Sequence, residues 1–298
     1  MARELDARDL RLIVAIAAEG SIAAAARQLD YSQPTASQHL AGLETRLGAR
    51  LVERDSRGAR LTELGALLAG HAAELLEQLD TVEADVRRRA EHGVSTLRLG
   101  TFPSAGSELA PRAMAALAKS GLLVEVLEAE VPELLVALQR RSVHAALVFA
   151  SPEEPLAALA GVRFLHLFDD EHLVVLPAGH PATAKAAVAL TDLRDERWIA
   201  APDDDDPSFA ALVRACRREG FEPTFAHRVD SFSMTQGFVA AGLGVSLLPR
   251  LAMVPIRDDI VLRPLTRARV VRSVQVAYLE SLAPALQDRL LAALMAQV

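Results

Sequence analysis

Several residue types are scarce in this chain of 298 residues, and each scarcity excludes a class of protein. Cys216 is the only cysteine, so neither an intrachain disulfide, nor a sensor that closes one, nor a zinc–thiolate cluster can form. No apolar run approaches the roughly 20 residues that a membrane helix needs. The amino terminus carries charges where a signal peptide is apolar. We therefore expect a cytoplasmic protein without a membrane partner.

The motifs of common enzymes are also missing. The chain has no Gly-x-Ser-x-Gly elbow, no phosphate loop and no His-Glu-x-x-His pair. His166 and His172 flank the acidic residues 169–171, a cluster that could bind a metal ion. The interpretation that we favour is a β-turn between two strands, 162–168 and 172–177. We expect no enzyme activity, no catalytic residue, no metal and no cofactor.

Lysine is scarce as well, because Lys119 and Lys185 are the only two, so arginine supplies nearly all of the positive charge. The net charge of the chain is −7. Residues 1–65 hold equal numbers of arginines and acids, so the acidity lies downstream. Within that first part, arginines gather between 46 and 60. Arginine is suited to bidentate contact with phosphates.

Residues 21–47 carry the strongest pattern of the chain, two short helices that meet across a tight turn. Ser21 and Ser32 can cap the helices through their hydroxyls, and Pro34 is tolerated in a first turn. Asp30 stands at the reversal, where it can adopt the left-handed region. Ala36, Leu40, Leu43 and Leu47 recur at helical spacing as an inner face. The pattern predicts a helix-turn-helix whose second helix enters a DNA major groove.

The sequence around this motif resembles the amino-terminal signature of the LysR-type transcriptional regulators. The resemblance covers Ala18–Glu44 and continues through Leu47–Arg54 and Leu61–Gly65. One departure is that Gln38 and His39 stand where a more basic pair is common. The resemblance implies DNA binding as a dimer, or a dimer of dimers, with contact to RNA polymerase as a further expectation.

Candidate DNA contacts come from the two helices and from a wing. Two short strands near 51–52 and 59–61, with a turn between them, complete a winged helix-turn-helix. For the wing arginines, phosphate contact is favoured over the alternative of a solvated face. The predicted DNA-binding residues are Ser21, Ser32, Gln33, Pro34, Thr35, Ser37, Gln38, His39, Arg46, Arg54, Arg57 and Arg60.

A long helix is predicted over residues 63–92, capped by Thr62. Its apolar stripe includes Leu68, Leu75 and Leu79, which nothing within the stretch itself can bury. A single exposed amphipathic helix of this length is unstable, so a partner helix is needed, most simply a second copy of the chain. The family resemblance implies the same linker and dimerisation helix.

After residue 93 the pattern changes to strands alternating with helices, which predicts βαβ units and a mostly parallel sheet. The stretch 151–161, with two prolines, is interpreted as a link between two lobes. The predicted fold is therefore a mainly α winged helix-turn-helix domain (1–62), a linker helix (63–92) and a two-lobed α/β effector domain like a periplasmic binding protein (93–298). Lobe I is expected at about 95–160 and 266–298, and lobe II at about 161–265.

Ligands of open α/β sheets bind beyond the carboxyl ends of the strands, so loops there are candidates for a small-molecule effector site. For each single residue, helix capping is an equally good explanation, and the group is better supported than its members. An acidic run at 203–206 is usually a solvated loop, but at the mouth of a cleft it disfavours an anionic effector and suggests an amine or a neutral one. The candidates are Thr101, Phe102, Ser104, Ala150, Ser151, Ala200, Pro202, Ser231, Phe232 and Ser233.

The sequence thus predicts a transcriptional regulator that binds promoter DNA and responds to a small molecule. The alternative is a free solute-binding or enzyme-like cleft protein, in which the first domain serves only for assembly. Binding to duplex DNA that falls steeply with salt separates the two, because phosphate neutralisation releases counterions.

Overall fold

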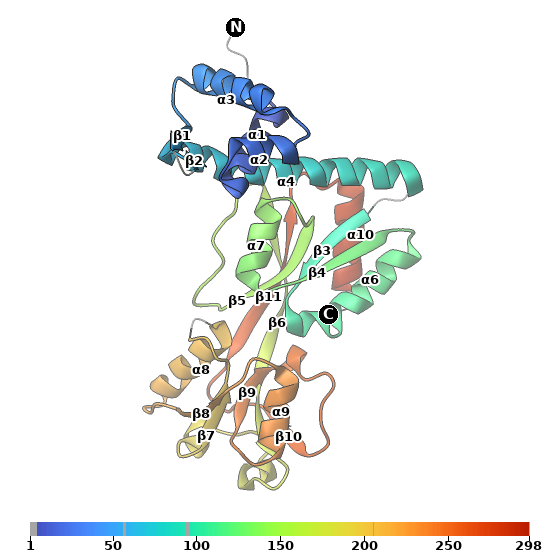
Figure 1. The fold of residues 1–298 in the computed structure, drawn as a ribbon. Coiled ribbons are helices and arrows are strands. Elements are labelled where there is room, and N and C mark those ends of the chain that lie inside the picture. Colours follow the sequence, from blue (N-terminus) through green and yellow to red (C-terminus); the bar gives the residue numbers. More distant parts are fainter. Residues whose placement is uncertain (1–4, 56–57, 93–95, 205, 298) are drawn as a thin grey trace. The chain divides into compact units, whose positions relative to one another are not determined.

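The computed structural model describes residues 5–55, 58–92, 96–204 and 206–297. The chain divides into two compact units, Met1–Gly93 and Val94–Val298, and each is described by itself (Figure 1). Among the described residues, no helix is long and apolar enough to cross a membrane.

The first unit begins with three helices whose ends follow the capping signals in the sequence. Ser21 Oγ accepts a hydrogen bond from the amide of Ala24 at 3.4 Å, and Ser32 Oγ accepts one from the amide of Thr35 at 3.3 Å. Asp30 adopts a φ of 58° at the reversal. The predicted helix-turn-helix is confirmed. The three helices are α1 (Ala7–Glu19), α2 (Ile22–Gln28) and α3 (Gln33–Leu47).

The inner face of α3 packs against α1 and α2 and completes the core of this unit. Ala36, Leu40 and Leu43 are buried together with residues of both other helices. Leu47, which its spacing placed on the same face, is 43% exposed. It is the last residue of α3 and lies past the edge of the core, so the helical period alone overestimated the buried face.

A wing follows α3, made of β1 (Val52–Asp55) and β2 (Gly58–Leu61) in antiparallel register. Glu44 Oε1 ties the wing to α3, because it accepts hydrogen bonds from the amides of Leu51 and Val52 at 2.8 and 3.2 Å. The wing is therefore attached to α3 at its base.

The long helix α4 (Glu63–His92) begins at Thr62, whose hydroxyl accepts a hydrogen bond from the amide of Gly65 at 3.0 Å. Ala69 and Ala72 are buried in the core that α1 helps to form. Gly65 lies so close to the strand side of the wing that a Cβ there would meet the carbonyl oxygen of Leu51 at 2.1 Å. The glycine is thus required by a backbone-to-backbone approach.

The second unit is organised around one sheet, which has seven strands in the described part of the chain, in the order β10-β6-β11-β5-β3-β4 with β9 also on β6. β3 pairs in parallel with β4 and β5, as the predicted βαβαβ pattern requires. β11 returns antiparallel between β5 and β6. These strands are β3 (Thr96–Thr101), β4 (Leu123–Glu128), β5 (Ala145–Ala150), β6 (Val162–Pro177), β9 (Ser246–Pro249), β10 (Ile260–Arg263) and β11 (Val271–Leu279).

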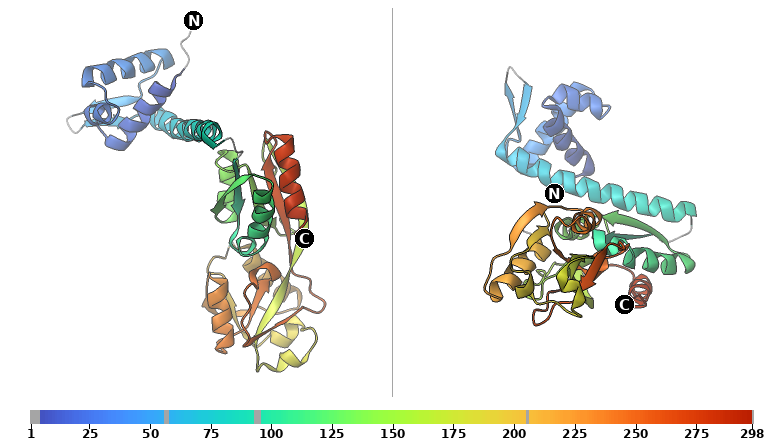
Figure 2. Two further views of the ribbon diagram at one scale, coloured as in Figure 1. Left: turned by 90° about the vertical axis from the view of Figure 1, so that its right-hand side faces the viewer. Right: turned by 90° about the horizontal axis from the view of Figure 1, so that it is seen from below.

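β6 corrects the sequence prediction at residues 169–171. It is one continuous strand of 16 residues, not two strands joined by a turn. Its first part pairs with β11, and its second part pairs with β9 and β10. The acidic residues looked like a turn, but Asp170 is buried against a partner of opposite charge and stays within the strand. The chain therefore crosses between two lobes inside β6 and not within the predicted link 151–161 (Figures 1 and 2).

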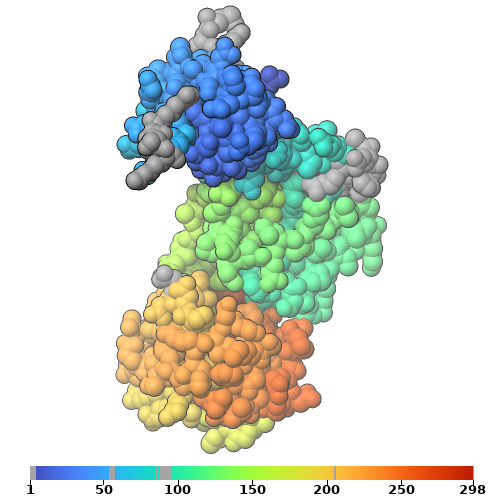
Figure 3. Space-filling view, viewed as in Figure 1, coloured from blue at the N-terminus to red at the C-terminus, as the bar shows by residue number. Residues whose placement is uncertain are grey.

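Each lobe of this unit has a core of its own. The core of lobe I joins β3, β5 and β11 to the helices around them. Lobe II holds a small parallel sheet, β7 (Arg197–Ala200) and β8 (Thr224–Arg228), beside the far part of β6. Figure 3 shows the two lobes as distinct masses of side chains. The helices are α5 (Pro103–Gly106), α6 (Leu109–Lys119), α7 (Val131–Gln139) and α10 (Pro284–Met295) in lobe I, and α8 (Pro207–Arg218) and α9 (Phe232–Ala240) in lobe II.

Two glycines of α4 give a matched test of this packing. Gly65→Ala should lower the stability of the first unit, because its Cβ would collide with the carbonyl of Leu51. Gly70→Ala should raise it by about 0.5–1 kcal/mol, since nothing lies within 4 Å of a Cβ there and alanine favours a helix. Thermal unfolding of the two variants measures both effects. Equal changes in melting temperature would contradict the described packing of α4 against the wing at Gly65 and Leu51.

Candidate functional site

Several of the predicted DNA contacts lie on the outer face of α3. Pro34 and Gln38 are exposed there, one turn apart, while Thr35, Ser37 and His39 are half-buried. The ring of His39 packs edge-on against Tyr31 at 5.5 Å, which fixes its position on the α2 side of the helix. Ser32 and Thr35 share a hydroxyl hydrogen bond of 2.7 Å at the amino end of α3. Of these side chains beyond the first turn of α3, Gln38 is the exposed one.

The remaining predicted DNA contacts differ in what surrounds them. Ser21 is half-buried as a helix cap, whereas Gln33 and Arg60 are exposed. Arg46 forms an ion pair with the buried carboxylate of Asp9, so it holds α3 against α1, a structural role that the sequence analysis did not assign. The side chain of Arg54 and the whole of Arg57 lie outside the described residues, and the structure gives no account of these two predictions.

An uncovered apolar stripe runs along α4. Leu75 and Leu79 are 51% and 37% exposed, while Leu68 is half-buried against the core of the unit. On a helical wheel the stripe is centred about 100° from the face that carries Ala69 and Ala72. The same stripe contains four further exposed apolar residues: Leu64, Leu67, Val82 and Val86.

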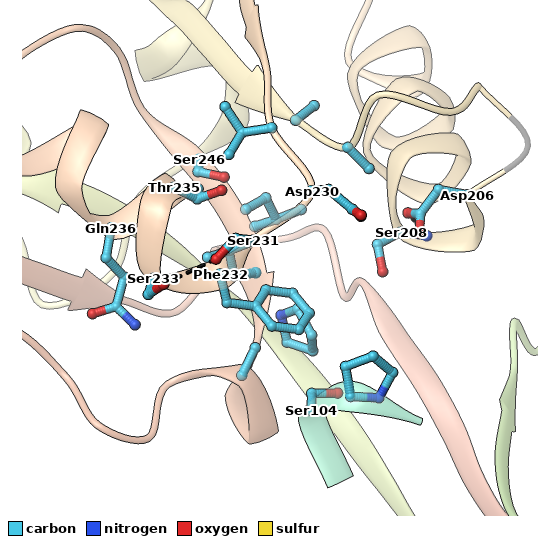
Figure 4. A pocket seen from close by; sticks show the side chains of 18 of the residues that line it. Ser104, Asp206, Ser208, Asp230, Ser231, Phe232, Ser233, Thr235, Gln236 and Ser246 are labelled. Carbon is cyan, nitrogen blue, oxygen red and sulfur yellow. Dashed lines mark hydrogen bonds between the residues drawn. The ribbon is translucent and has the colours of Figure 1, made fainter. Parts of the chain in front are cut away.

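A cavity of about 690 Å³ lies between the two lobes of the second unit. Six of the predicted effector residues line it. Ser104 belongs to lobe I, and Ser231 and Ser233 stand at the start of α9 in lobe II, where their hydroxyls share a hydrogen bond of 2.9 Å (Figure 4). The six residues are Phe102, Ser104, Ala200, Ser231, Phe232 and Ser233.

Four predicted residues do not line this cavity. Thr101 is buried, and its hydroxyl donates to the carbonyl of Phe102 at 3.3 Å. Ser151 donates to Glu153 at 2.8 Å and accepts from Arg214 of α8, so its hydroxyl is already engaged by these two side chains. Ala150 is buried in the sheet and Pro202 is exposed. Position at a strand end does not determine which way a side chain turns.

Arg272 is the central residue of the cavity wall, and the sequence analysis missed it. Its guanidinium pairs with Asp170 at 2.8 Å and donates to Ser104 Oγ at 2.6 Å. It lies between the rings of Phe102 and Phe149, 4.9 and 4.5 Å from their centroids. A lone arginine in the apolar strand 270–274 was the signal that could have pointed to it.

Carboxyl groups from both lobes face this region. Burial raises the pKa of Glu130, and the nearby charges of Asp206 and Asp230 raise it further. Burial also raises the pKa of Asp206, opposed by the amides of Phe209 and Ser208 that it caps. Glu130, Asp206 and Asp230 all line the cavity. Of the acidic run, Asp206 faces the cleft while Asp204 pairs with Arg228 at 2.9 Å outside it.

Two further titratable groups of lobe II carry no charge near neutral pH. Burial lowers the pKa of His172 to about 3, and Arg272 adds to the shift. Its Nε2 lies 3.2 Å from Ser208 Oγ, so it supports a residue of the cavity wall. Burial raises the pKa of Cys216 to about 12. That thiol is therefore inert as a nucleophile.

These two units define a class of protein: a winged helix-turn-helix domain combined with a two-lobed α/β domain that has a cavity between its lobes. Family models match both units. "Bacterial regulatory helix-turn-helix protein, lysR family" covers residues 7–66, and "LysR substrate binding domain" covers residues 90–298. The chain belongs to the LysR family of DNA-binding transcriptional regulators, which carry an effector-binding domain and are not enzymes.

Individual relatives agree with this assignment. The chain is 34% identical over 247 residues to a protein of Mycobacterium avium named "Probable hydrogen peroxide-inducible genes activator", covering 82% of this chain and 78% of that protein. It is 30% identical to the regulator TfdS of Cupriavidus pinatubonensis, covering 82% of each. In fold it resembles full-length CbnR crystallised with its target DNA, with a TM-score of 0.69 at 22% identity, covering 99% of this chain and 100% of that one.

Substitution of two adjacent aspartates on β6 tests how much the buried ion pair contributes to the free energy of unfolding. Asp170→Ala leaves the buried guanidinium of Arg272 without a countercharge, which should cost about 3–5 kcal/mol of stability. Asp169→Ala removes exposed contacts to His166 and Arg269 and should cost at most about 1 kcal/mol. Calorimetric unfolding distinguishes the two. Similar losses of stability in the two variants would show that the buried pair of Arg272 and Asp170 does not stabilise the second unit more than an exposed contact does.

Proposed function

We propose that this regulator reads promoter DNA through Gln38 and its neighbours on α3, while the wing and Arg60 contact phosphates. The observation that carries the proposal is the exposure of Gln38 on a helix whose opposite face is fixed in the core. Glutamine can bind adenine with two hydrogen bonds in the major groove. Thr35 and Ser37 lie beside it, and the exposed amino end of α3 is placed to meet the DNA backbone.

The active form is a homodimer joined through α4, and it assembles further into a dimer of dimers. The exposed stripe of α4 supports this, because six of its large apolar side chains have no cover in the described part of one chain. Pairing with a second α4 removes them from water. A dimer also places two winged units on two half-sites of a promoter, which in a bacterium lies in the cytoplasm.

The effector is a small molecule bound in the cavity between the lobes. The cavity volume falls in the range of ligand pockets, and its walls combine apolar rings with a few convergent polar groups. A ligand that contacts both walls favours one arrangement of the lobes, and this shifts the population of DNA-binding forms. The regulator then contacts RNA polymerase from the promoter.

The relative from Mycobacterium avium carries a name that refers to hydrogen peroxide. Thiol chemistry is an unsuitable sensor in this chain, because Cys216 has no second cysteine to pair with and is buried with a pKa raised to about 12. The cavity, rather than a thiol, is therefore the site that we propose for the signal.

Base reading is tested by Gln38→Ala. Affinity for the specific site should fall by about 1–3 kcal/mol, while affinity for random duplex changes little, because the lost bonds exist only with the correct base. Fluorescence anisotropy on both duplexes measures this. Gln139→Ala, the same change at an exposed position of α7, is the control. Equal losses on both duplexes would exclude base reading by Gln38.

Assembly is tested by Leu75→Asp, which places a carboxylate in the proposed interface between two α4 helices. Burial of this charge without a partner is strongly unfavourable. Sedimentation should show monomers where the parent protein is a dimer or tetramer. Ala73→Asp adds the same charge to the exposed opposite face of α4 and should leave the assembly intact. An intact Leu75→Asp dimer would mean that the stripe is covered in another way.

A further inference from the structure

The charges of the cavity wall are unbalanced. Four carboxyl groups line it, those of Glu128, Glu130, Asp206 and Asp230, against two guanidinium groups. Both guanidinium groups have partners, because Arg272 pairs with Asp170 and Arg257 pairs with Asp259 at 2.7 Å. An anionic ligand would therefore lose its hydration beside carboxylates, and neither arginine of the wall is unpaired and available to neutralise its charge.

The acidic groups come from both lobes and from separate elements. Glu130 precedes α7 in lobe I, Asp206 caps α8, and Asp230 follows β8 in lobe II. In Figure 4, Asp230 lies between the serines of α9 and the pair Asp206 and Ser208. Burial raises the pKa of Glu130, and repulsion by the two aspartates raises it further. A positive charge placed between them relieves this repulsion and draws the lobes together.

A buried threonine in the cavity wall points independently to a ligand at this place. Thr235, the fourth residue of α9, lines the cavity and is 3% exposed. No hydrogen bond of its hydroxyl occurs within the described part of the chain, and this hydroxyl is open to the cavity that it lines. Beside it, Ser246 Oγ donates to the carbonyl of Ile199 at 2.8 Å and keeps lone pairs free to accept (Figure 4). An ammonium group, which has three donors and no acceptor, matches walls that offer acceptors.

The rest of the wall is apolar and aromatic. Phe102, Phe149, Phe209 and Phe232 all line the cavity. This surface fits the carbon body of an organic molecule, and aromatic faces also attract a cation. The cavity thus offers carboxylates and hydroxyls to a charged end and rings to an apolar end.

We propose that the effector is a small organic cation, a protonated amine on an apolar or aromatic body, held by Glu130, Asp206 and Asp230. The proposal rests on the proposed function, because it names the ligand class of the same cavity. It follows from charges and contacts of this chain's own residues. The binding step is an ion pairing without covalent chemistry.

A pair of isosteric probes tests the charge preference at neutral pH. Phenethylamine and 3-phenylpropionate have the same body and opposite charges, and each is titrated into the full-length protein by calorimetry. The amine should bind at least roughly tenfold more tightly than the acid, since a charge-assisted hydrogen bond contributes at least that factor. Equal or tighter binding of the acid, or no binding of either probe, would overturn the proposal.

Variants then locate the charge. Asp230→Asn and Glu130→Gln should each weaken amine binding by roughly tenfold. Neither variant should weaken the binding of the acid, because each removes a carboxylate that repels it. Asp204→Asn, a neighbouring acid that does not line the cavity, should bind the amine like the parent. The melting temperature of each variant without ligand checks folding, and for Glu130→Gln it should not fall, because repulsion is removed. Unchanged amine affinity in both cavity variants would overturn the assignment, as would Ca²⁺ binding that depends on the same residues and displaces the amine.

The two levels of the proposal fail differently. Sequence-specific DNA binding is measured on the same preparation of the protein. Specific DNA binding without a preference for the amine overturns the cation assignment alone. Absence of specific DNA binding overturns the proposed function, whatever the amine does.

Discussion

The buried pair of Arg272 and Asp170 is the interaction on which the second unit depends. The two residues lie on neighbouring strands, β11 and β6, at the place where the sheet passes from one lobe to the other. Ser104 of lobe I accepts from the same guanidinium, and Asp170 accepts from the amide of Leu251 in lobe II at 3.2 Å. Buried charges are tolerated when each has its partners. The pair of Arg272 and Asp170 therefore links the two lobes through hydrogen bonds at one side of the cavity.

The same constraint determines the character of the cavity. Because Asp170 takes the charge of Arg272, the arginine supports the wall without making the cavity positive. The carboxyl groups of Glu130, Asp206 and Asp230 also line the cavity. At the other end of the chain, the pairing of Arg46 with Asp9 has a comparable effect, since it fixes α3 on α1. In both units, an internal ion pair sets the geometry of a surface that binds something else.

Much of the fold was predictable because its signals are local. Ser21, Ser32 and Thr62 cap the helices that follow them, and the spacing of Ala36, Leu40 and Leu43 shows which face of α3 is buried. The cavity was predictable only in part. Phe102 and Ser231 follow strands, as the general rule for α/β folds requires, but the rule does not determine the orientation of Thr101 or Ser151. Arg272 lies 102 residues from Asp170 along the chain, so no local pattern could show that the two meet. The same long-range pairing explains why a charged stretch of β6 resembled a turn.

The central claim is that two copies of one winged unit read DNA in a defined arrangement. Selection of bound duplexes from a random library by the full-length protein, followed by sequencing, tests it most directly. We expect enrichment of two half-sites related by two-fold symmetry, with centres about 10 base pairs apart or a multiple of that. Recovery of sequences without a shared motif, or of a single unrepeated half-site, would contradict it.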